Sequence, residues 1–324
     1  MRLTNRTDLQ QVRQFYSRAL KQQNTKILVC CGTGCIAGGA FIIRDQLAAL
    51  LKDKGQDVTV EMAEEPHKNE INIKSSGCHG FCEMGPLVRI EPSGYLYIKV
   101  KPEDCEEIVS ETVIGGRHIP RLAYSFNDKP YPKQEEIPFY QQQTRLVLEH
   151  CGHIDATSIK EYLGHGGYSA LEKCLFELSP DRIIQELSDS GLRGRGGGGF
   201  PAGRKWAEVQ RQKAKPKYVV CNGDEGDPGA FMDRSIMEGD PHKLLEGMAI
   251  AAFAIGSDEG YIYVRAEYPL AIKRLRKAIT DAEARNYLGK NIFGTDFSFE
   301  LHIKEGAGAF VCGEETALIA SIEG

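Results

Sequence analysis

The sequence has neither a strong charge imbalance nor a long apolar run. Its 324 residues include 45 acidic and 40 basic side chains, for a formal net charge of −5, so the composition indicates neither a nucleic-acid partner nor an acidic membrane surface as a target. The longest strongly apolar run, Met248 to Ile255, is far too short to span a bilayer. The N-terminal residues are polar and carry no secretory signal. We therefore expect a cytoplasmic protein, with any membrane association made through partners.

The chain also lacks internal repeats and long low-complexity tracts, so its domains must be read from hydrophobic periodicity. With 41% hydrophobic residues, a chain of this length suits two ordinary domains. The first, over residues 1–114, is predicted to be a small α/β domain. Its expected helices cover 8–22, 37–54 and a segment opened by Pro102, and its expected strands cover 26–30, 57–62, 69–74, 87–90 and 95–98.

Residues 115–143 lack clear periodicity and contain Pro120, Pro130, Pro132 and Pro138, which predicts an extended linker. Strand-like and helix-like runs then alternate over residues 144–324, a pattern typical of a layered α/β domain. The run Tyr218 to Cys221 is predicted to be a buried strand. The last expected helix has no strand after it, so this second domain is expected to be incomplete. The expected strands are 217–221, 261–264 and 297–303, and the expected helices are 181–189, 242–255, 269–288 and 314–322.

Ten cysteines without a secretory signal argue against a disulfide framework, because cytosolic reductants keep thiols reduced. Cys30 and Cys35 form a C-x4-C pair, and Cys78 and Cys82 form a C-x3-C pair in a second glycine-rich loop. Four such thiolates favour a [2Fe–2S] cluster over a structural zinc, which more often has C-x2-C spacing, or four unrelated buried cysteines. Cys31 is interpreted as spare, because adjacent residues on extended backbone point in opposite directions. Isolated cysteines are expected to be buried small hydrophobes: Cys105, Cys151 and Cys174.

The stretch from Gly191 to Trp206 combines bare backbone with four cations. Glycines let successive N–H groups surround a phosphate and leave room for a flat ring, and the cations supply countercharge. The stretch satisfies G-x-G-x-x-G, but helix-like residues precede it where a dinucleotide-binding fingerprint requires a strand, so we reject an ordinary Rossmann site. A flexible linker is disfavoured because serine is absent and ordered-type residues follow the glycines. The four cations are Arg193, Arg195, Arg204 and Lys205.

Two acidic loops follow, at 222–229 and 306–316. The first comes directly after a predicted strand, where ligand-binding residues of α/β folds belong. Its carboxylates would repel phosphate, but they can accept hydrogen bonds from ribityl and ribose hydroxyls, and Asn222 can donate and accept at a flavin edge. The alternative for each acid is a solvated turn or a helix N-terminus. An EF-hand calcium loop is excluded, because the required alternation of oxygen ligands is missing.

Three of these segments, in this order, closely resemble the flavin-bearing, NADH-oxidising subunit of respiratory complex I and its relatives in soluble NAD-linked and electron-bifurcating hydrogenases and formate dehydrogenases. They are Arg195–Pro201, Asn222–Glu225 and Gly313–Thr316. The N-terminal domain resembles a thioredoxin-like [2Fe–2S] ferredoxin, and its fusion in one chain resembles the hydrogenase branch. The implied fold is α/β: a thioredoxin-like [2Fe–2S] domain (1–114), a linker (115–143) and a truncated FMN- and NAD(H)-binding domain (144–324).

The resemblance also implies roles for individual residues. The cluster ligands would be Cys30, Cys35, Cys78 and Cys82. The dinucleotide would be lined by Phe200, Asp227 and Glu315. The FMN would be held by Gly194, Arg195, Gly196, Gly197, Lys205, Asn222, Asp224, Glu225, Gly313 and Glu314.

Two departures accompany the resemblance. Phe310 stands where complex I members usually have a tyrosine before the Cys-Gly-Glu-Glu turn, which loses a phenolic hydrogen bond but keeps the ring. Family members also continue into a ubiquitin-like domain and a helical bundle whose cysteines bind a [4Fe–4S] cluster. We therefore expect that cluster only in a C-terminal part missing from this chain.

The implied function is an NADH dehydrogenase or diaphorase module that transfers hydride between NAD(H) and FMN and passes electrons to iron–sulfur subunits of a hydrogenase or complex I-like assembly. No protein nucleophile or acid–base pair is expected, because the flavin carries the chemistry. Acidic Asp227 and Glu315 would disfavour a 2′-phosphate, which favours NAD over NADP. The alternatives are the diaphorase subunit of an NAD-dependent formate dehydrogenase, or a non-catalytic iron–sulfur module without flavin.

Overall fold

The computed structural model describes residues 3, 5–60, 62 and 70–324, and the chain divides into two compact units. The cysteine unit comprises Gln14–His165 together with Ser235–Asp240. The glycine-loop unit comprises Met1–Arg13, Gly166–Arg234 and Pro241–Gly324. Two of the expected strands, 57–62 and 69–74, include Glu61 and Asn69, which lie outside the described residues.

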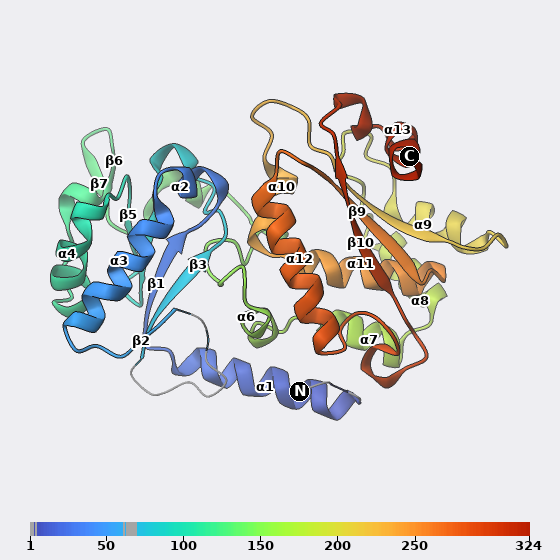
Figure 1. The fold of residues 1–324 in the computed structure, drawn as a ribbon, viewed down its shortest axis with the longest axis horizontal. Coiled ribbons are helices and arrows are strands. Elements are labelled where there is room, and N and C mark those ends of the chain that lie inside the picture. The colour runs from blue at the N-terminus through green and yellow to red at the C-terminus, as the bar shows by residue number, and fades with distance from the viewer. Residues whose placement is uncertain (1–2, 4, 61, 63–69) are drawn as a thin grey trace. The chain divides into compact units, whose positions relative to one another are not determined.

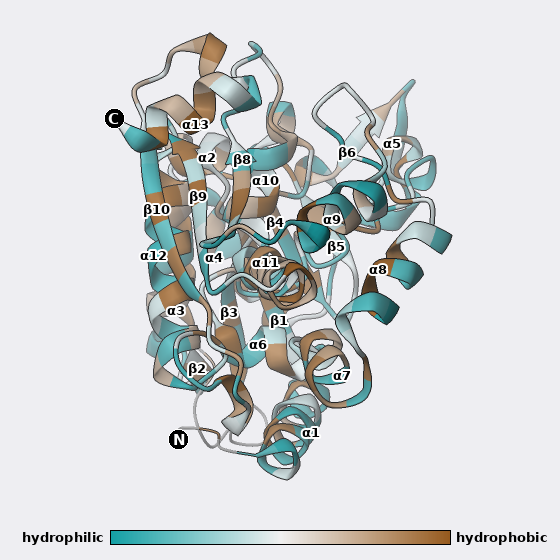
Figure 2. Cartoon of the chain, turned by 90° about the vertical axis from the view of Figure 1, so that its right-hand side faces the viewer, coloured by the Kyte–Doolittle hydropathy of each residue, from teal (hydrophilic) through white to brown (hydrophobic). Residues whose placement is uncertain are grey.

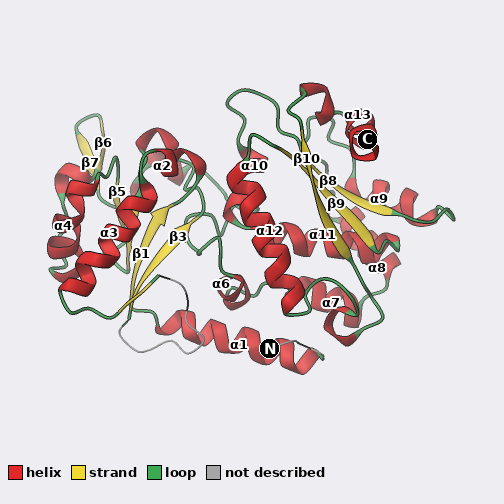
Figure 3. Cartoon of the chain, viewed as in Figure 1, coloured by secondary structure: helices red, strands yellow, loops and turns green. Residues whose placement is uncertain are grey.

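A five-stranded sheet in the order β2-β3-β1-β4-β5 forms the centre of the cysteine unit (Figure 3). β1 pairs in parallel with β3, from Thr25↔Ile71 to Cys30↔Ser76, and antiparallel with β4. This register places Cys30 at the end of a central strand, beside the loop that carries Cys78. The strands are β1 (Thr25–Cys30), β2 (Val58–Thr59), β3 (Ile71–Ser76), β4 (Val88–Glu91) and β5 (Tyr95–Tyr97).

The helix expected over 37–54 begins at Ala40, and a separate short helix, Thr33–Ala37, precedes it. Gly39 between them has φ 93°, a left-handed conformation that glycine adopts without strain and that ends a helix. The second of the two helices packs on the sheet. The helices and turns of this unit are α1 (Arg6–Gln22, shared with the other unit), α2 (Thr33–Ala37), α3 (Ala40–Asp53), η1 (Cys82–Met84), η2 (Pro102–Asp104), α4 (Cys105–Glu107), a π-helix (Ile108–Ile114) and α6 (Ile159–Gly164).

The prediction of an extended linker over 115–143 is wrong for its local structure. Ile119, Leu122 and Ile137 are buried in the core of the cysteine unit, and burial of such side chains stabilises an ordered path despite the four prolines. The error arose because short turns and a small hairpin leave no helical or strand periodicity. The segment contains η4 (Pro120–Leu122), β6 (Tyr124–Phe126), β7 (Lys129–Tyr131), η5 (Gln134–Glu136) and α5 (Pro138–Gln141).

A parallel three-stranded sheet in the order β10-β9-β8 forms the centre of the glycine-loop unit (Figure 1). The apolar helix α11, shown largely in brown in Figure 2, contacts α7, α8, α9 and α12 as well as β8 and β9. The elements are α7 (Ser169–Glu177), α8 (Pro180–Asp189), α9 (Ala202–Arg211), β8 (Tyr218–Gly223), α10 (Met232–Gly239, shared with the cysteine unit), α11 (Pro241–Ile255), β9 (Glu259–Arg265), α12 (Pro269–Ala284), η6 (Ile292–Gly294), β10 (Glu300–Gly306), η7 (Phe310–Gly313) and α13 (Glu315–Glu323).

Tyr218 to Cys221 is a strand, as expected, but the expectation that it is buried is wrong. Tyr218 and Val220 are 46% and 39% exposed, whereas Val219 and Cys221 are half-buried, because alternate side chains of a strand point to opposite sides. Within the described residues, no helix has the length and apolar character needed to cross a membrane.

A buried polar cluster ties α7 to α11. Tyr168 donates its backbone N–H to Glu246 Oε2 at 2.7 Å, and Leu171 N–H donates to the other oxygen at 3.0 Å. The Tyr168 hydroxyl pairs with His242 Nδ1 at 3.0 Å. Burial lowers the pKa of His242 to about 3, so this imidazole is neutral in the folded protein at neutral pH.

We expect acid to destabilise the protein in part through His242. Its pKa is about 3 in the fold and about 6.5 in an unfolded chain, so the unfolded state binds more protons. The stability it contributes is complete above about pH 6.5 and is lost as the pH falls towards the folded value. Between about pH 7 and about pH 5 this amounts to ~2 kcal/mol. Urea titrations at both pH values measure this change in the free energy of unfolding. If a His242→Asn variant lost as much stability as the wild type between the two pH values, the assignment to His242 would be contradicted.

Candidate cofactor sites

The four predicted cluster cysteines come together in the cysteine unit. Cys78 and Cys82 have their sulfurs 3.5 Å apart. Hydrogen bonds with Cys35 and Cys78 raise the pKa of the Cys30 thiol, and hydrogen bonds with Cys30 and Cys82 lower that of Cys78. These interactions link the four thiols in the order Cys35, Cys30, Cys78 and Cys82. Four thiols contributed by two loops are a donor set that suits a [2Fe–2S] cluster.

Glycines bring the backbone close to these sulfurs. A Cβ on Gly85 would lie 2.6 Å from Cys35 Sγ, and one on Gly32 would lie 3.1 Å from Cys78 Cβ. Gly80 N–H donates to Cys78 Sγ at 3.3 Å. Backbone donors to sulfur stabilise thiolate and tune a bound cluster. The donor set and its close-fitting loops therefore fit a [2Fe–2S] cluster.

His79, which sequence reasoning did not single out, anchors the second cysteine loop. It is fully buried, and its ring nitrogens lie 2.9 Å from Ser76 Oγ and 3.0 Å from Gln134 Oε1. Arg145 donates to its carbonyl oxygen at 2.5 Å. Burial lowers the pKa of His79 to about 4, so the ring is neutral at neutral pH. Gln134 comes from the segment predicted to be a linker, which therefore supports the loop that carries Cys78.

The predicted spare cysteine and the isolated ones are buried. Cys31 has no exposed surface, and its backbone N–H donates to Ser76 O at 2.9 Å, which continues the strand pairing. The prediction of buried small hydrophobes is confirmed for the isolated set of Cys105, Cys151 and Cys174.

In the glycine-loop unit, the two acidic loops meet beyond the end of β8. Asn222 Nδ2 donates to Gly313 O at 2.8 Å, and Asn222 Oδ1 accepts from Asp224 N–H at 3.1 Å. A Cβ on Gly313 would lie 3.3 Å from Asp224 O. Asn222, near the end of β8, therefore joins this strand and the loop after it to η7, which precedes α13.

One oxygen of Asp224 is buried without a partner. The side chain is 2% exposed, its Oδ2 has no hydrogen-bond partner, and Arg265 Nε lies 3.8 Å from its Oδ1. Burial raises the pKa of this carboxyl, and the Arg265 charge partly offsets the rise. An unsatisfied buried oxygen costs ~1–3 kcal/mol, so a hydroxyl donor reaching Asp224 would recover that free energy. This orphaned acceptor fits a polyhydroxylated cofactor.

Two predicted flavin ligands cap helices in this structure. Glu225 accepts from Asp233 and Arg234 N–H at the start of α10, each at 3.1 Å. Glu314 accepts from Thr316 and Ala317 N–H at the start of α13, and these bonds lower its pKa. Both acids therefore occupy helix N-termini in this structure, which was the alternative to cofactor binding that the sequence left open. Arg265 and Tyr268 donate to Glu225 O at 3.1 and 3.0 Å. Neither residue was predicted from the sequence, although the position of Arg265 at the end of the strand β9 could have identified it as a candidate.

The glycine-rich loop is closed at its base and open at its tip. Gly194 N–H donates to Phe200 O, and Ala202 N–H donates to Leu192 O, both at 2.9 Å. A Cβ on Gly196 or Gly197 would meet no atom within 4 Å. The loop therefore offers exposed backbone N–H groups beside free space, as a phosphate or flat ring requires.

The residues predicted to face the dinucleotide lie on three different segments. Lys205 Nζ donates to Glu315 Oε2 at 3.0 Å, which joins α9 to α13. Phe200 is 42% exposed and lies under the Arg204 guanidinium, 5.6 Å from ring centroid to Cζ. Asp227 is exposed in the loop after β8. The structure therefore pairs Glu315 with a predicted flavin residue rather than with Phe200 or Asp227.

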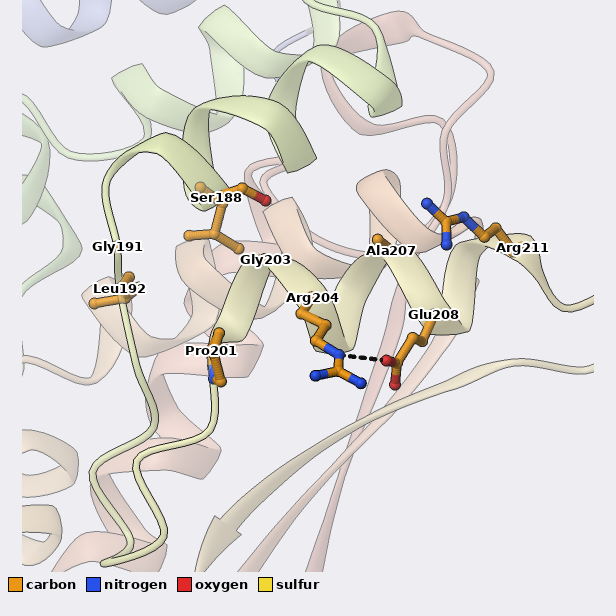
Figure 4. Close-up of a pocket in the computed structure, with 10 residues that line it drawn as sticks. Ser188, Gly191, Leu192, Pro201, Gly203, Arg204, Ala207, Glu208 and Arg211 are labelled. Carbon is orange, nitrogen blue, oxygen red and sulfur yellow. Dashed lines mark hydrogen bonds and ion pairs between the residues drawn. The ribbon is translucent and has the colours of Figure 1, made fainter.

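A cavity of about 460 Å³ lies between α8 and α9, behind the base of the glycine-rich loop (Figure 4). Arg204 and Glu208 line it and are bonded to each other at 2.8 Å. None of its lining residues comes from the acidic loops. The cavity is therefore distinct from the part of this unit in which Asp224 Oδ2 has no hydrogen-bond partner.

Known families match both halves of the chain. Residues 3–113 match the family described as thioredoxin-like [2Fe–2S] ferredoxin, and residues 187–324 match the family described as Nuo51 FMN-binding domain.

Curated relatives match more than half of the chain. The NADP-reducing hydrogenase subunit HndC of Solidesulfovibrio fructosivorans is 55% identical over 184 residues, covering 57% of this chain and 37% of the relative. An NADH-quinone oxidoreductase subunit of Aquifex aeolicus is 54% identical over 196 residues, covering 60% and 45%. An NADH-quinone oxidoreductase subunit of Rhizobium meliloti is 52% identical over 179 residues, covering 55% and 42%. The matched part spans less than half of each relative.

Two kinds of solved structure are similar to the chain. The air-oxidized NAD+-reducing [NiFe]-hydrogenase aligns over 93% of this chain and 46% of its own, with 25% identity and a TM-score of 0.43. The thioredoxin-like [2Fe–2S] ferredoxin from Aquifex aeolicus aligns over 32% of this chain and 99% of its own, with 24% identity and a TM-score of 0.25.

Proposed function

The chain joins a thioredoxin-like [2Fe–2S] ferredoxin domain to a Nuo51 FMN-binding domain, and from that premise we propose that it is an NADH dehydrogenase module which passes electrons from NAD(H) through FMN to iron–sulfur centres. The predicted family, α/β fold class and cofactor classes are confirmed by these two matches. The substrate, the individual ligands and the assembly that the module serves are our proposals.

The observation that carries the flavin proposal is the buried, unpartnered Oδ2 of Asp224. It lies in a strand-end loop that Asn222 ties to Gly313, in a unit that also presents an open glycine-rich loop. Ribityl hydroxyls are suitable donors to such an oxygen. We infer that Asp224 binds the ribityl chain and that the loop at Gly194–Gly197 receives the phosphate and ring.

When bound, FMN would supply the hydride and electron chemistry, and the chain would supply position and charge. Asn222 holds the two acidic loops together, so their spacing is fixed before a cofactor arrives. Arg265 limits the cost of the buried Asp224 carboxyl. Lys205 provides a cation near the glycine-rich loop, where Glu315 now engages it. No side chain of this site is assigned as a nucleophile or general base.

We propose NAD(H) as the preferred dinucleotide. Asp227 in the loop after β8 and Glu315 at the start of α13 carry negative charge at exposed positions, and carboxylates disfavour a 2′-phosphate. HndC is named as a subunit of an NADP-reducing hydrogenase, so NADPH is the necessary comparison. The proposed partners are iron–sulfur subunits of a hydrogenase or complex I-like assembly, and the proposed compartment is the cytoplasm; a formate dehydrogenase is the alternative assembly.

Anaerobic purification followed by visible spectroscopy and assays of iron and flavin tests the module. We expect about two irons and one FMN per chain, and bleaching of the flavin band on addition of NADH before NADPH. Iron with no flavin, even after incubation with free FMN, would contradict the flavin proposal and favour a non-catalytic iron–sulfur module. Flavin that NADPH bleaches faster than NADH would overturn the dinucleotide preference alone.

A further inference from the structure

A short segment from far along the sequence belongs to the cysteine unit. Ser235–Asp240, which forms the end of α10, groups with Gln14–His165 rather than with the chain on either side of it. It lies against the second cysteine loop so closely that a Cβ on Gly77 would be 2.5 Å from Gly239 Cα. Cys78 is the next residue after Gly77. The approach of two glycine backbones fixes this segment beside a proposed cluster ligand.

The same segment bonds to the first cysteine loop through Glu238. Its Oε2 accepts from Thr33 N–H at 3.1 Å, and its Oε1 accepts from Thr33 Oγ1. Thr33 lies between the proposed ligands Cys30 and Cys35, and Glu238 is only 1% exposed. One acidic side chain, 205 residues away in sequence, therefore holds the loop that carries two of the four thiols.

A second acid in this segment has a different partner. Asp240 is also 1% exposed, and its Oδ2 accepts from His150 Nδ1 at 2.7 Å. Cys151 Sγ donates to Ser235 O at 3.8 Å. The segment thus has anchors that do not involve either cysteine loop, and a change at Glu238 leaves those anchors in place.

We propose that Glu238 is a positioning residue for the [2Fe–2S] cluster that also lowers the reduction potential of the cluster. This inference rests on the proposed function, because it requires that the chain binds a [2Fe–2S] cluster. Reduction adds an electron, and a carboxylate buried beside the cluster loop opposes that added charge with little screening by solvent. Net charge around a cluster is one of the known determinants of its potential.

The Glu238→Gln variant tests the charge. Glutamine keeps the size of the side chain and an oxygen that can accept from Thr33, but it removes the negative charge. In the full chain with its cluster loaded, potentiometric titration followed by electron paramagnetic resonance of the reduced cluster measures the midpoint. We expect the ratio of reduced to oxidised cluster at a fixed potential to rise roughly tenfold, equivalent to a shift of ~59 mV for one electron.

Three further variants separate charge from packing. Glu238→Asp keeps the charge and should stay near the wild-type potential. Thr33→Val removes one donor and keeps the charge, so the potential should stay or fall. Asp240→Asn removes a buried carboxylate of the same segment that bonds His150, and its shift should be several-fold smaller than that of Glu238→Gln.

The outcomes are distinguishable. A wild-type potential in Glu238→Gln, or an equal shift in Asp240→Asn, would refute the proposal. If Glu238→Gln holds no iron, the potentials of Glu238→Asp and Thr33→Val test the proposal instead. A cluster potential above that of the wild type in either variant would overturn the proposal. A wild-type chain that binds no cluster on reconstitution would instead refute the proposed function, and the inference with it.

Discussion

Cys30→Ala is expected to abolish cluster binding, while Cys31→Ala is expected to leave it intact. The two neighbours are equally buried, at 1% and 0% exposure, so both variants delete a similar volume from the same core. They differ in their contacts, because the Cys30 thiol bonds with those of Cys35 and Cys78. Loss of this thiol removes the link between the two cysteine loops.

Iron content and the visible and electron paramagnetic resonance spectra after anaerobic reconstitution measure the effect. We expect iron to fall from about two per chain to background in Cys30→Ala. Thermal unfolding of the two variants without iron provides the control, because equal losses of stability show that packing alone does not explain the difference. If Cys31→Ala loses iron and Cys30→Ala does not, Cys31 is the ligand and our choice of the C-x4-C pair is wrong.

Gly196→Val is expected to prevent FMN binding while leaving the fold intact. A Cβ at this position meets no atom within 4 Å, and φ at Gly196 is outside the positive range that requires glycine. The valine is therefore tolerated by the protein itself. Its side chain would occupy the open space over the loop where the cofactor is proposed to lie, and we expect the affinity for FMN to fall at least a hundredfold, or ~2.7 kcal/mol.

Gly198→Val is the matched control. Gly198 has the same open surroundings and an ordinary φ, but it is not among the proposed flavin residues. Titration of the flavin-free chain with FMN, followed by quenching of flavin fluorescence, compares the two. If Gly196→Val bound FMN as tightly as the wild type does, Gly196 would not belong to the FMN site. An equal loss of FMN affinity in both variants would mean that the site is not confined to Gly194–Gly197.

The local structure was largely predictable from the sequence. The strands 26–30 and 261–264 and the helices 242–255 and 269–288 correspond to β1, β9, α11 and α12, because burial on one side of an element imposes its period on the residues. The packed segment 115–143 was not predictable, because the apolar residues that it contributes to the core stand apart from one another between turns. The exposed side of β8 was also missed, because an apolar run does not reveal which side of a strand is covered.

The cysteine pairs, the open glycine-rich loop and the two acidic loops could be identified without any coordinates, because ligand type and backbone freedom are properties of single residues and short spacings. The partners of buried polar groups could not be identified from the sequence. Three-dimensional packing places His79 against Gln134 and Thr33 against Glu238, and it leaves Asp224 Oδ2 with no partner. These outcomes depend on which distant segments pack together, since a buried polar group is satisfied or orphaned by its neighbours in space rather than by its neighbours in sequence.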